Sequence, residues 1–281
     1  MNQHIDLHLH STCSDGTFSP AEVAWRAIEA DLAVISLTDH DSMEGVKAAQ
    51  EEGEKLGLEV IPGTELSTQV DGKDIHILGY FIEGDHPGLV DCLKTCRGER
   101  KNRAERIVKK LNSLGMRIPF EQVLAKAGNG AIGRPHVADV LVEEGFVFSA
   151  NEAFQKFLGY SKPAYEPKYT LSPAEAIQVI HAAGGLACLA HPGLYGRDDL
   201  IPGLVEDGLD GIEVRHTRHG QAEIKRYTEV AEQFGLLPSG GSDCHGDGRG
   251  SSVIGTVDVP RRYIDDLGAL AQEKASEVRE S

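Results

Sequence analysis

The first ten residues place two histidines and an aspartate on one face of a predicted β-strand. Residues 4–10 read His-Ile-Asp-Leu-His-Leu-His, so that apolar and polar side chains alternate. Successive strand residues point to opposite faces, and the alternation therefore puts Asp6, His8 and His10 on one side. Two imidazoles that lie two residues apart at a strand end can reach one cation together. The segment predicts a metal-binding strand.

Six further short apolar segments follow, and helical patterns separate most of them. We expect strands over residues 5–10, 33–38, 58–62, 75–81, 186–190, 211–214 and 236–239. The segments Ser19-Pro20-Ala21-Glu22 and Ser172-Pro173-Ala174-Glu175 are typical helix starts, because each offers Ser as N-cap and Pro as the first helical residue. Strand–helix alternation predicts an α/β fold with a mostly parallel sheet and helices outside it.

The middle of the chain has a different pattern. From about residue 84 to 163 the apolar residues follow a helical period, and we find no convincing strand. We therefore expect an all-helical insertion over residues 84–163 that contributes to substrate binding. The flanking residues 1–83 and 164–281 would form the metal-dependent domain.

Charge and cysteine content narrow the class of protein. The net charge of −16 argues against broad coating of nucleic acid, so we expect no duplex DNA partner. Residues 94–110 are an exception, because they carry eight Lys and Arg against two Glu. This segment is either a site for an anionic ligand or a solvated helix face. The five cysteines suggest no disulfide framework. We find no signal peptide and no apolar run long enough for a membrane helix, and we expect a cytoplasmic protein.

Possible metal ligands end or follow several of the expected strands. Each one alone has an ordinary structural explanation, such as a turn for Asp15, and Asp39 and Asp41 are alternatives beside His40. The joint pattern is specific, because the strand ends of parallel α/β barrels converge on one site. Nine ligands suit two or three ions rather than one. The candidate set is His8, His10, Asp15, His40, Glu65, His76, His191, Asp243 and His245.

These motifs resemble those of the polymerase-and-histidinol-phosphatase (PHP) family. The resemblance is carried by His-Leu-His-Ser-Thr-Cys-Ser-Asp-Gly, Thr-Asp-His-Asp, Gly-Thr-Glu, His-Ile-Leu-Gly-Tyr, Ala-His-Pro and Ser-Asp-Cys-His. It covers about residues 4–82 and 170–255. It implies a distorted seven-stranded barrel with a trinuclear metal centre.

The resemblance also implies how the ligands are shared among three ions. One ion would lie between His8, His10, Glu65 and Asp243. A second would lie between Glu65, His76 and His191, and a third between Asp15, His40 and His245. Mixed imidazole and carboxylate ligands tolerate Mn, Fe or Zn. We expect two to three divalent transition-metal ions, with Mn²⁺ favoured over Fe²⁺ or Zn²⁺.

Within the family, the insertion with Gly133-Arg134-Pro135-His136 is similar to nucleoside 3′,5′-bisphosphate phosphatases. The resemblance implies a phosphoric monoester hydrolase that removes the 3′-phosphate and leaves a 5′-nucleotide, by attack of a metal-bridging hydroxide on phosphorus. The alternatives are 5′-to-3′ exoribonuclease activity on short 5′-phosphorylated RNA, histidinol-phosphate hydrolysis, an amidohydrolase and a non-catalytic metal module. The base, the choice between free nucleotide and RNA, the general acid and the oligomeric state remain open.

Several side chains outside the ligand set are candidates for substrate contacts. Arg forms bidentate bonds to phosphate, and His136 can donate to phosphate or protonate the leaving oxygen. Arg134 and His136 have an alternative explanation as a helix start. The predicted substrate-binding residues are Ser11, Arg97, Arg100, Arg134, His136, Arg215 and His216, and the predicted catalytic residues are Asp243 and His136. The basic helix around Arg97, Arg100 and Arg103 would bind a second phosphate.

Overall fold

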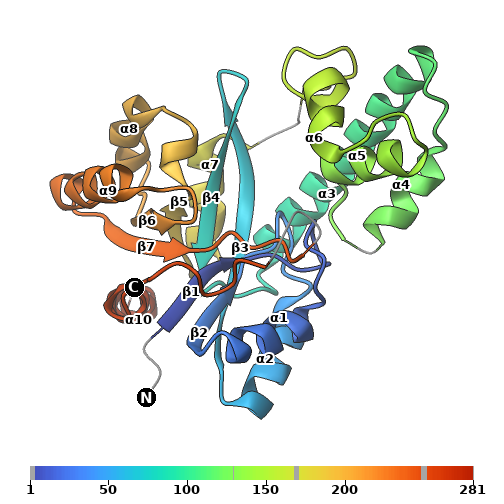
Figure 1. Ribbon diagram of the computed structural model, residues 1–281. Coiled ribbons are helices and arrows are strands. Elements are labelled where there is room, and N and C mark those ends of the chain that lie inside the picture. Colours follow the sequence, from blue (N-terminus) through green and yellow to red (C-terminus); the bar gives the residue numbers. More distant parts are fainter. Residues whose placement is uncertain (1–3, 129, 168–170, 248–251, 281) are drawn as a thin grey trace.

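A single seven-stranded sheet curls almost into a barrel in the computed structural model, which describes residues 4–128, 130–167, 171–247 and 252–280 (Figure 1). The strands are β1 His4–Leu9, β2 Leu32–Leu37, β3 Glu59–Val70, β4 Lys73–Tyr80, β5 Leu186–Leu189, β6 Gly211–His216 and β7 Leu237–Gly241. Their order in the sheet follows their order in the chain. Beyond β7 the chain returns to β1, where the Asp243 amide donates to the carbonyl of His8 at 2.8 Å. All seven predicted strands are therefore present, and the predicted α/β barrel is confirmed.

The sheet is mostly parallel, as the alternation predicts, with one antiparallel interruption. Strand β4 runs antiparallel to both β3 and β5, whereas the other neighbouring strands pair in parallel. A tight turn at Asp71 and Gly72 joins β3 to β4, and both residues have positive φ angles of 51° and 76°. An Asp-Gly pair suits such a turn. The prediction ended β3 at residue 62, which is too early, because small and polar residues continue the strand to Val70.

Helices cover the outside of the sheet. Ser19 accepts a hydrogen bond from the Glu22 amide at 3.2 Å, and Ser172 forms a capping box with Glu175, so both predicted helix starts are confirmed. None of the helices in the described part of the chain combines the length and the apolar character that a membrane span needs. The helices around the barrel are α1 Pro20–Glu29, α2 Val46–Leu56, α7 Pro173–Ala182, α8 Ile201–Glu206, α9 Gln221–Phe234 and α10 Arg262–Glu280, with short 3₁₀ turns at Pro192–Leu194 and Asp198–Leu200.

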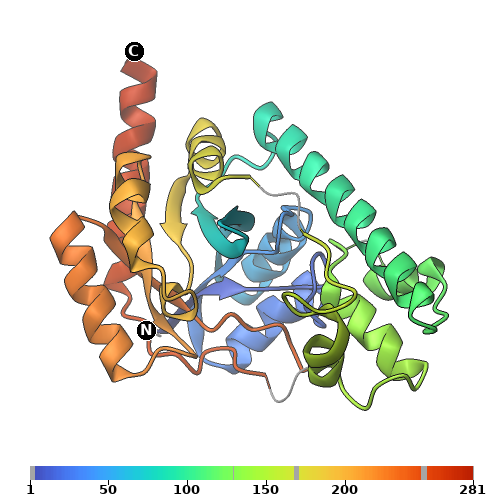
Figure 2. The same cartoon turned by 90° about the horizontal axis from the view of Figure 1, so that it is seen from above.

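A second group of helices stands to one side of the barrel (Figure 2). Its elements are α3 Pro87–Ser113, α4 Phe120–Ala127, α5 Arg134–Glu143, α6 Ala150–Ala153 and the π-helical turn η1 Phe154–Leu158. The described residues between 84 and 163 form helices and turns without a strand, as the apolar period indicates. The group has an apolar core of its own, which includes Leu111, Val123, Val137 and Leu141.

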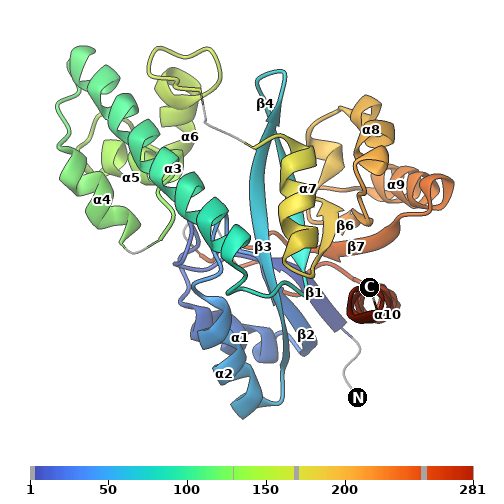
Figure 3. The ribbon, with the colours of Figure 1, turned by 180° about the vertical axis from the view of Figure 1, so that it is seen from behind.

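Helix α3 connects the two cores (Figure 3). Its first turns place Leu89 and Leu93 in the barrel core beside Ile180, whereas Ile107 and Leu111 lie in the core of the helical group. The helix crosses from one body to the other without a break over 27 residues. The basic segment 94–110 therefore belongs to the helix that joins the barrel to the helical group.

Candidate metal centre and its surroundings

Glu65 lies at the centre of a ring of imidazoles inside the mouth of the barrel. Both of its carboxylate oxygens face histidines that come from distant parts of the chain. Oε2 lies 3.3 Å from His8 Nε2, 3.3 Å from His10 Nε2 and 3.0 Å from His40 Nδ1. Oε1 lies 2.8 Å from His76 Nδ1 and 3.0 Å from His191 Nε2. The carboxylate is completely buried, so bulk solvent does not screen its interaction with these rings.

All nine predicted ligands meet in this region. Three sets of ligand atoms lie within 4.8 Å of one another: His8 with His10, Glu65 and Asp243; His10 with Asp15, His40 and His245; and His40 with Glu65 and His76. The first set is the one that the resemblance implies, and the second contains the implied third-ion ligands with His10 added. In the last set His40 stands where the resemblance implies His191.

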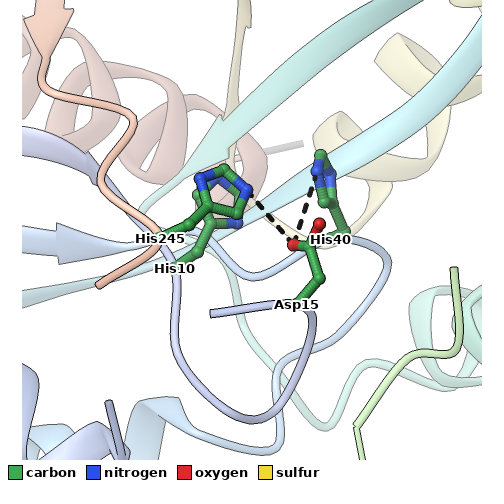
Figure 4. A group of neighbouring side chains, drawn as sticks. All are labelled: His10, Asp15, His40 and His245. Carbon is green, nitrogen blue, oxygen red and sulfur yellow. Dashed lines mark ion pairs between the residues drawn. The ribbon is translucent and has the colours of Figure 1, made fainter. Parts of the chain in front are cut away.

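Asp15 and three imidazoles form the outermost of these sets (Figure 4). The Asp15 carboxylate points between two rings, with Oδ1 3.2 Å from His245 Nε2 and 3.9 Å from His40 Nε2. The ring of His10 stacks on that of His245, with 4.1 Å between the centroids. The loop after β1, the end of β2 and the segment after β7 thus supply this set.

Buried polar atoms show that the donor set fits cations. His8 Nε2, His10 Nε2 and Glu65 Oε2 form no hydrogen bond with any residue that the structure describes, although each of the two nitrogens lies 3.3 Å from Glu65 Oε2. Buried polar atoms in native proteins nearly always have partners. Imidazole nitrogens and carboxylate oxygens are ligands for divalent Mn, Fe and Zn. A cation at this position would give all three atoms a partner.

The backbone is held in an unusual conformation at two of the strand ends. His191 follows β5 with a φ of 29°, and Asp243 follows β7 with a φ of 55°. Positive φ is uncommon outside glycine and is costly for a bulky side chain. Hydrogen bonds hold both residues there, because the His191 amide donates to Glu213 at 2.7 Å and the Asp243 amide donates to the His8 carbonyl. The turns aim both side chains back into the barrel mouth.

The charge states of Glu65 and His40 suit metal binding, whereas that of His10 opposes it. Burial by itself raises the pKa of Glu65, but His40, His76 and His8 outweigh it and hold that pKa well below its usual range. Burial lowers the pKa of His40 to about 4, despite the nearby carboxylates of Glu65 and Asp15. Burial also opposes charge on His10, yet Asp243 and Glu65 raise its pKa to about 10. A proton on His10 must therefore leave when a cation binds.

Sequence analysis missed a buried carboxylate that supports two of the ligands. Glu213 is completely buried in β6, its Oε1 lies 3.1 Å from His8 Nδ1, and its Oε2 accepts from the His191 amide. A carboxylate behind a ligating histidine fixes the orientation of the ring and raises its basicity. An ionisable residue in the middle of the apolar strand Gly-Ile-Glu-Val was the signal available in the sequence.

The two alternative ligands beside His40 have other partners. Asp39 accepts from the hydroxyls of Ser11 and Ser14 at 2.6 and 2.5 Å and from the Ser11 amide at 2.7 Å. Asp41 accepts from the Ser67 amide and from Arg100. Ser11, a predicted substrate contact, is completely buried and donates its hydroxyl to Asp39. These contacts tie the loop that carries Asp15 to Asp39 after β2.

The two candidates at the end of β6 point in different directions. His216 is buried beside the cluster, with Nε2 3.4 Å from Asp243 Oδ2. Arg215 instead reaches Asp258 at 3.4 Å on the outer side. The pairing of β6 with β7 shifts register between Glu213 and Arg215, so the strand carries a bulge there. The structure therefore brings His216, and not Arg215, to the ligand cluster.

The arginines of the helical group are anchored to acidic and polar residues. Arg97 pairs with Glu44, and Arg100 donates to Asp41 at 2.5 Å and to the Ser67 hydroxyl at 2.7 Å. Burial opposes the charge on Arg100, but the Asp41 carboxylate outweighs it and raises the pKa of Arg100. Arg103 is buried and donates to the carbonyl of Glu166. Arg100 therefore faces the barrel, whereas Arg103 faces a neighbouring loop.

Arg134 and His136 begin α5, which is the structural role that their sequence allows. The His136 Nδ1 atom accepts from the Gly133 amide at 3.0 Å, so a neutral ring carries its proton on Nε2. Arg134 donates to Asp74 at 3.3 Å and to the carbonyl of Leu158 at 3.3 Å. Asp74 lies in β4 two residues before the ligand His76. The start of α5 thus lies against the strand that carries His76.

A cavity adjoins α3 on the side of Arg97. It has a volume of about 530 Å³ and is lined by Arg97, Lys101, Glu44 and the loop at residues 130–132. The Ala131 amide donates to the carbonyl of Cys13, which ties this loop to the segment before Asp15. The cavity is therefore basic on balance and lies beside the ligand-bearing loop after β1.

Comparison with known proteins explains this arrangement. A family model described as the PHP domain matches residues 6–236. The chain belongs to the PHP family. A 3′,5′-nucleoside bisphosphate phosphatase from Chromobacterium violaceum is 36% identical over 265 residues, which are 92% of this chain and 93% of the relative. A 5′-3′ exoribonuclease from Haemophilus influenzae is 35% identical over 250 residues, which are 87% of this chain and 91% of the relative.

The structural comparison agrees with membership of the PHP family. A crystal structure of a protein assigned as a metal-dependent phosphoesterase, from Bifidobacterium adolescentis, has a TM-score of 0.87 to this chain. The two are 29% identical, and the match covers 95% of this chain and 96% of the other. Together with the candidate metal groups, PHP membership makes the chain a metal-dependent phosphoesterase.

Proposed function

We propose that the protein removes the 3′-phosphate from nucleoside 3′,5′-bisphosphates and leaves the 5′-nucleotide. The observation that carries this proposal is the position of two arginines from the helical group. Arg100 is anchored at Ser67 and Arg134 at Asp74, and each anchor lies two residues along a strand from a predicted ligand, Glu65 or His76. Two strand residues span about 7 Å. A substrate with two phosphates can then bind the cluster and an arginine together.

The proposed cofactor is a set of two to three divalent cations, with Mn²⁺ favoured. Its ligands would be the nine residues of the cluster, with Glu65 shared between two ions. When bound, such cations neutralise phosphate charge and lower the pKa of a bound water to about 7. No side-chain nucleophile is then required.

The side chains of this chain would orient the substrate and manage its charge. Arg100 has five N–H donors, and its bonds to Asp41 and Ser67 occupy two of them. The remaining donors can bind the 5′-phosphate in bidentate fashion. His136 carries a proton on Nε2 when neutral and can give it to the leaving ribose oxygen. Glu213 keeps the ring of His8 in one orientation.

A second candidate function is 5′-to-3′ exoribonuclease activity on short RNA with a 5′-phosphate. The basic cavity of about 530 Å³ beside Arg97 and Lys101 favours it, because a longer substrate needs room and positive charge beyond the first nucleotide. The relative from Haemophilus influenzae carries that activity in its name.

Phosphate release by the metal-loaded enzyme tests these functions. The substrates are adenosine 3′,5′-bisphosphate, AMP, histidinol phosphate and a 5′-phosphorylated dinucleotide. We expect fast release from the bisphosphate alone and AMP as the product. Preferential cleavage of the dinucleotide would favour the exoribonuclease, and preference for histidinol phosphate would overturn the proposal. Complete inactivity with stoichiometric metal would favour a non-catalytic metal module.

A further inference from the structure

A second cavity lies on the other side of the ligand cluster, and its walls are aromatic. It has a volume of about 460 Å³ and lies between the β3–β4 turn, the start of α5 and the loops after η1 and β5. The turn at the end of β3 and β4 rises beside this part of the helical group (Figure 1). The aromatic walls are Tyr160, Tyr165 and Tyr195. The rest of the lining is largely charged, with Asp71, Lys73, Asp74 and Arg134. The volume lies in the range of small-molecule sites.

Tyr195 forms a wall that the cavity shares with the cluster. Its hydroxyl accepts a hydrogen bond from the His76 amide at 2.9 Å, and its ring centroid lies 5.2 Å from that of His191. His76 and His191 both face Glu65 at about 3 Å. A molecule in the cavity is therefore one side chain away from the predicted ligands.

Tyr160 forms the opposite wall and is unusually exposed. Its side chain is 66% exposed, although exposure of an aromatic ring to water is unfavourable compared with its burial. The ring packs edge-on against Tyr165, with 5.2 Å between centroids, and its hydroxyl lies beside Gly72 of the β3–β4 turn. This T-shaped contact holds the ring while it leaves a face open.

Arg134 supplies the positive charge at the same cavity. Its guanidinium lies between Asp74 and the Phe154 ring, 5.7 Å from the ring centroid. The cavity beside Arg97 lacks aromatic residues among its described lining, whereas this one has three. The two cavities therefore differ in chemistry, one basic and one aromatic.

We infer that the cavity lined by Tyr160, Tyr165 and Tyr195 binds the base of the nucleotide by stacking. This inference rests on the proposed function, because the base must be attached to a phosphate that lies at the cluster. Stacking on an aromatic ring tolerates every base, since each has a π-face. The site would therefore require a base but discriminate weakly among bases.

Calorimetry with the reaction product and its base-free analogue tests this inference without hydrolysis. We expect the metal-loaded enzyme to bind AMP about 5- to 100-fold more tightly than ribose 5-phosphate, the range that one stacked base supplies. Tyr160→Ala should remove that difference, and Tyr160→Phe should keep it. UMP and GMP should bind within about tenfold of AMP, since stacking is sequence-tolerant.

Phe148→Ala is the matched control, because Phe148 is an exposed aromatic residue of the same helical group that does not line the cavity. It should leave both affinities unchanged. Equal affinity of the wild-type enzyme for AMP and ribose 5-phosphate would overturn the inference, and so would a Tyr160→Ala variant that keeps the difference. Neither result depends on which phosphate the enzyme removes, so failure of the proposed reaction is detected separately by the substrate panel.

Discussion

The ligand cluster and the arginines of the helical group are built in different ways. In the cluster, side chains from strand ends point into one buried space, and Glu65 alone faces five imidazoles. In the helical group, two arginines each meet an acid of the barrel, Arg100 with Asp41 and Arg134 with Asp74. The backbone of the sheet fixes the positions of the cluster side chains, whereas ion pairs between the helical group and the barrel fix the positions of the arginines. We expect substitutions in the cluster to abolish the reaction and substitutions at the arginines to change selectivity.

Glu65→Gln should have the largest effect. The substitution removes the carboxylate that belongs to two of the three ligand groups and leaves five imidazoles around a neutral amide. We expect kcat/KM to fall by at least about 1,000-fold, comparable to the loss of a major electrostatic stabiliser. Bound metal measured by elemental analysis should fall by at least one ion per chain.

Glu59→Gln is the control for this variant, because Glu59 is an exposed residue at the other end of β3. It should keep full activity and metal content. A Glu65→Gln enzyme with normal metal content and normal turnover would contradict the central role of this carboxylate.

Glu213→Gln should have a smaller effect through His8. The carboxylate of Glu213 has one oxygen for the His8 ring and another for the His191 amide, whereas a Gln amide has a single acceptor oxygen. The His8 ring therefore loses its fixed orientation. Loss of a carboxylate behind a ligating histidine typically costs about 10- to 100-fold in metal affinity. A chelator competition should show this weaker binding, and saturating metal should restore most of kcat. Unchanged metal affinity would mean that Glu213 only fills space in the core.

Arg100→Ala tests the other side of the comparison. Hydrogen bonds to a charged group are worth about 1.5–3 kcal/mol, so KM for the bisphosphate should rise by at least about tenfold. KM for a 3′-monophosphate should change far less. The substitution leaves buried Asp41 without its cation, and the double variant Arg100→Ala, Asp41→Asn therefore controls for stability. Equal changes in KM for the two substrates would remove Arg100 from phosphate recognition.

Asp210→Asn should have the smallest effect on catalysis, because this buried carboxylate lies in neither region. It accepts from His181 Nε2 at 2.7 Å and from the Ala187 amide at 2.8 Å, and it pairs with Lys274. Loss of these charge-assisted bonds should cost about 1–2 kcal/mol, or a few degrees in Tm, with kcat/KM unchanged.

The pH dependence of that variant follows from the pKa of Asp210. Burial raises this pKa, but hydrogen bonds from His181 and Lys274 outweigh burial and lower it below its ordinary value. The ionised form therefore stabilises the fold above about pH 4, and the contribution is lost as the pH falls through the folded-state pKa. Melting curves of wild type and variant should differ at pH 6 and converge in acid. A difference that grows in acid would contradict this.

Much of the fold follows from local patterns in the sequence. Alternating polarity identifies β1, and Ser19 and Ser172 mark two helix starts. Both features depend only on residues that are close in the sequence. The extension of β3 to Val70 depends on its antiparallel partner β4, which no local pattern in residues 63–70 reveals. All seven strands were therefore predicted, but the predicted β3 ended at residue 62 and the observed strand ends at Val70.

The candidate site divides in the same way. The nine ligands belong to motifs at strand ends, and the structure brings them together, while their role as ligands stays a prediction. The position of His216 depends on a bulge in β6, and the anchoring of Arg100 depends on Asp41 from a distant loop. Such contacts join residues that are far apart in the chain and have no local signature.

Under the proposed function, the uninterrupted length of α3 ties substrate selectivity to the rotation of the helical group about the helix axis. An α-helix of 27 residues is about 40 Å long and turns about 100° with each residue. One residue inserted after Arg100 would rotate the whole distal group about this axis and carry the start of α5 away from β4. The barrel and its cluster of predicted ligands would be untouched. A change in the length of α3 would therefore be one way for proteins with this barrel to acquire different substrates.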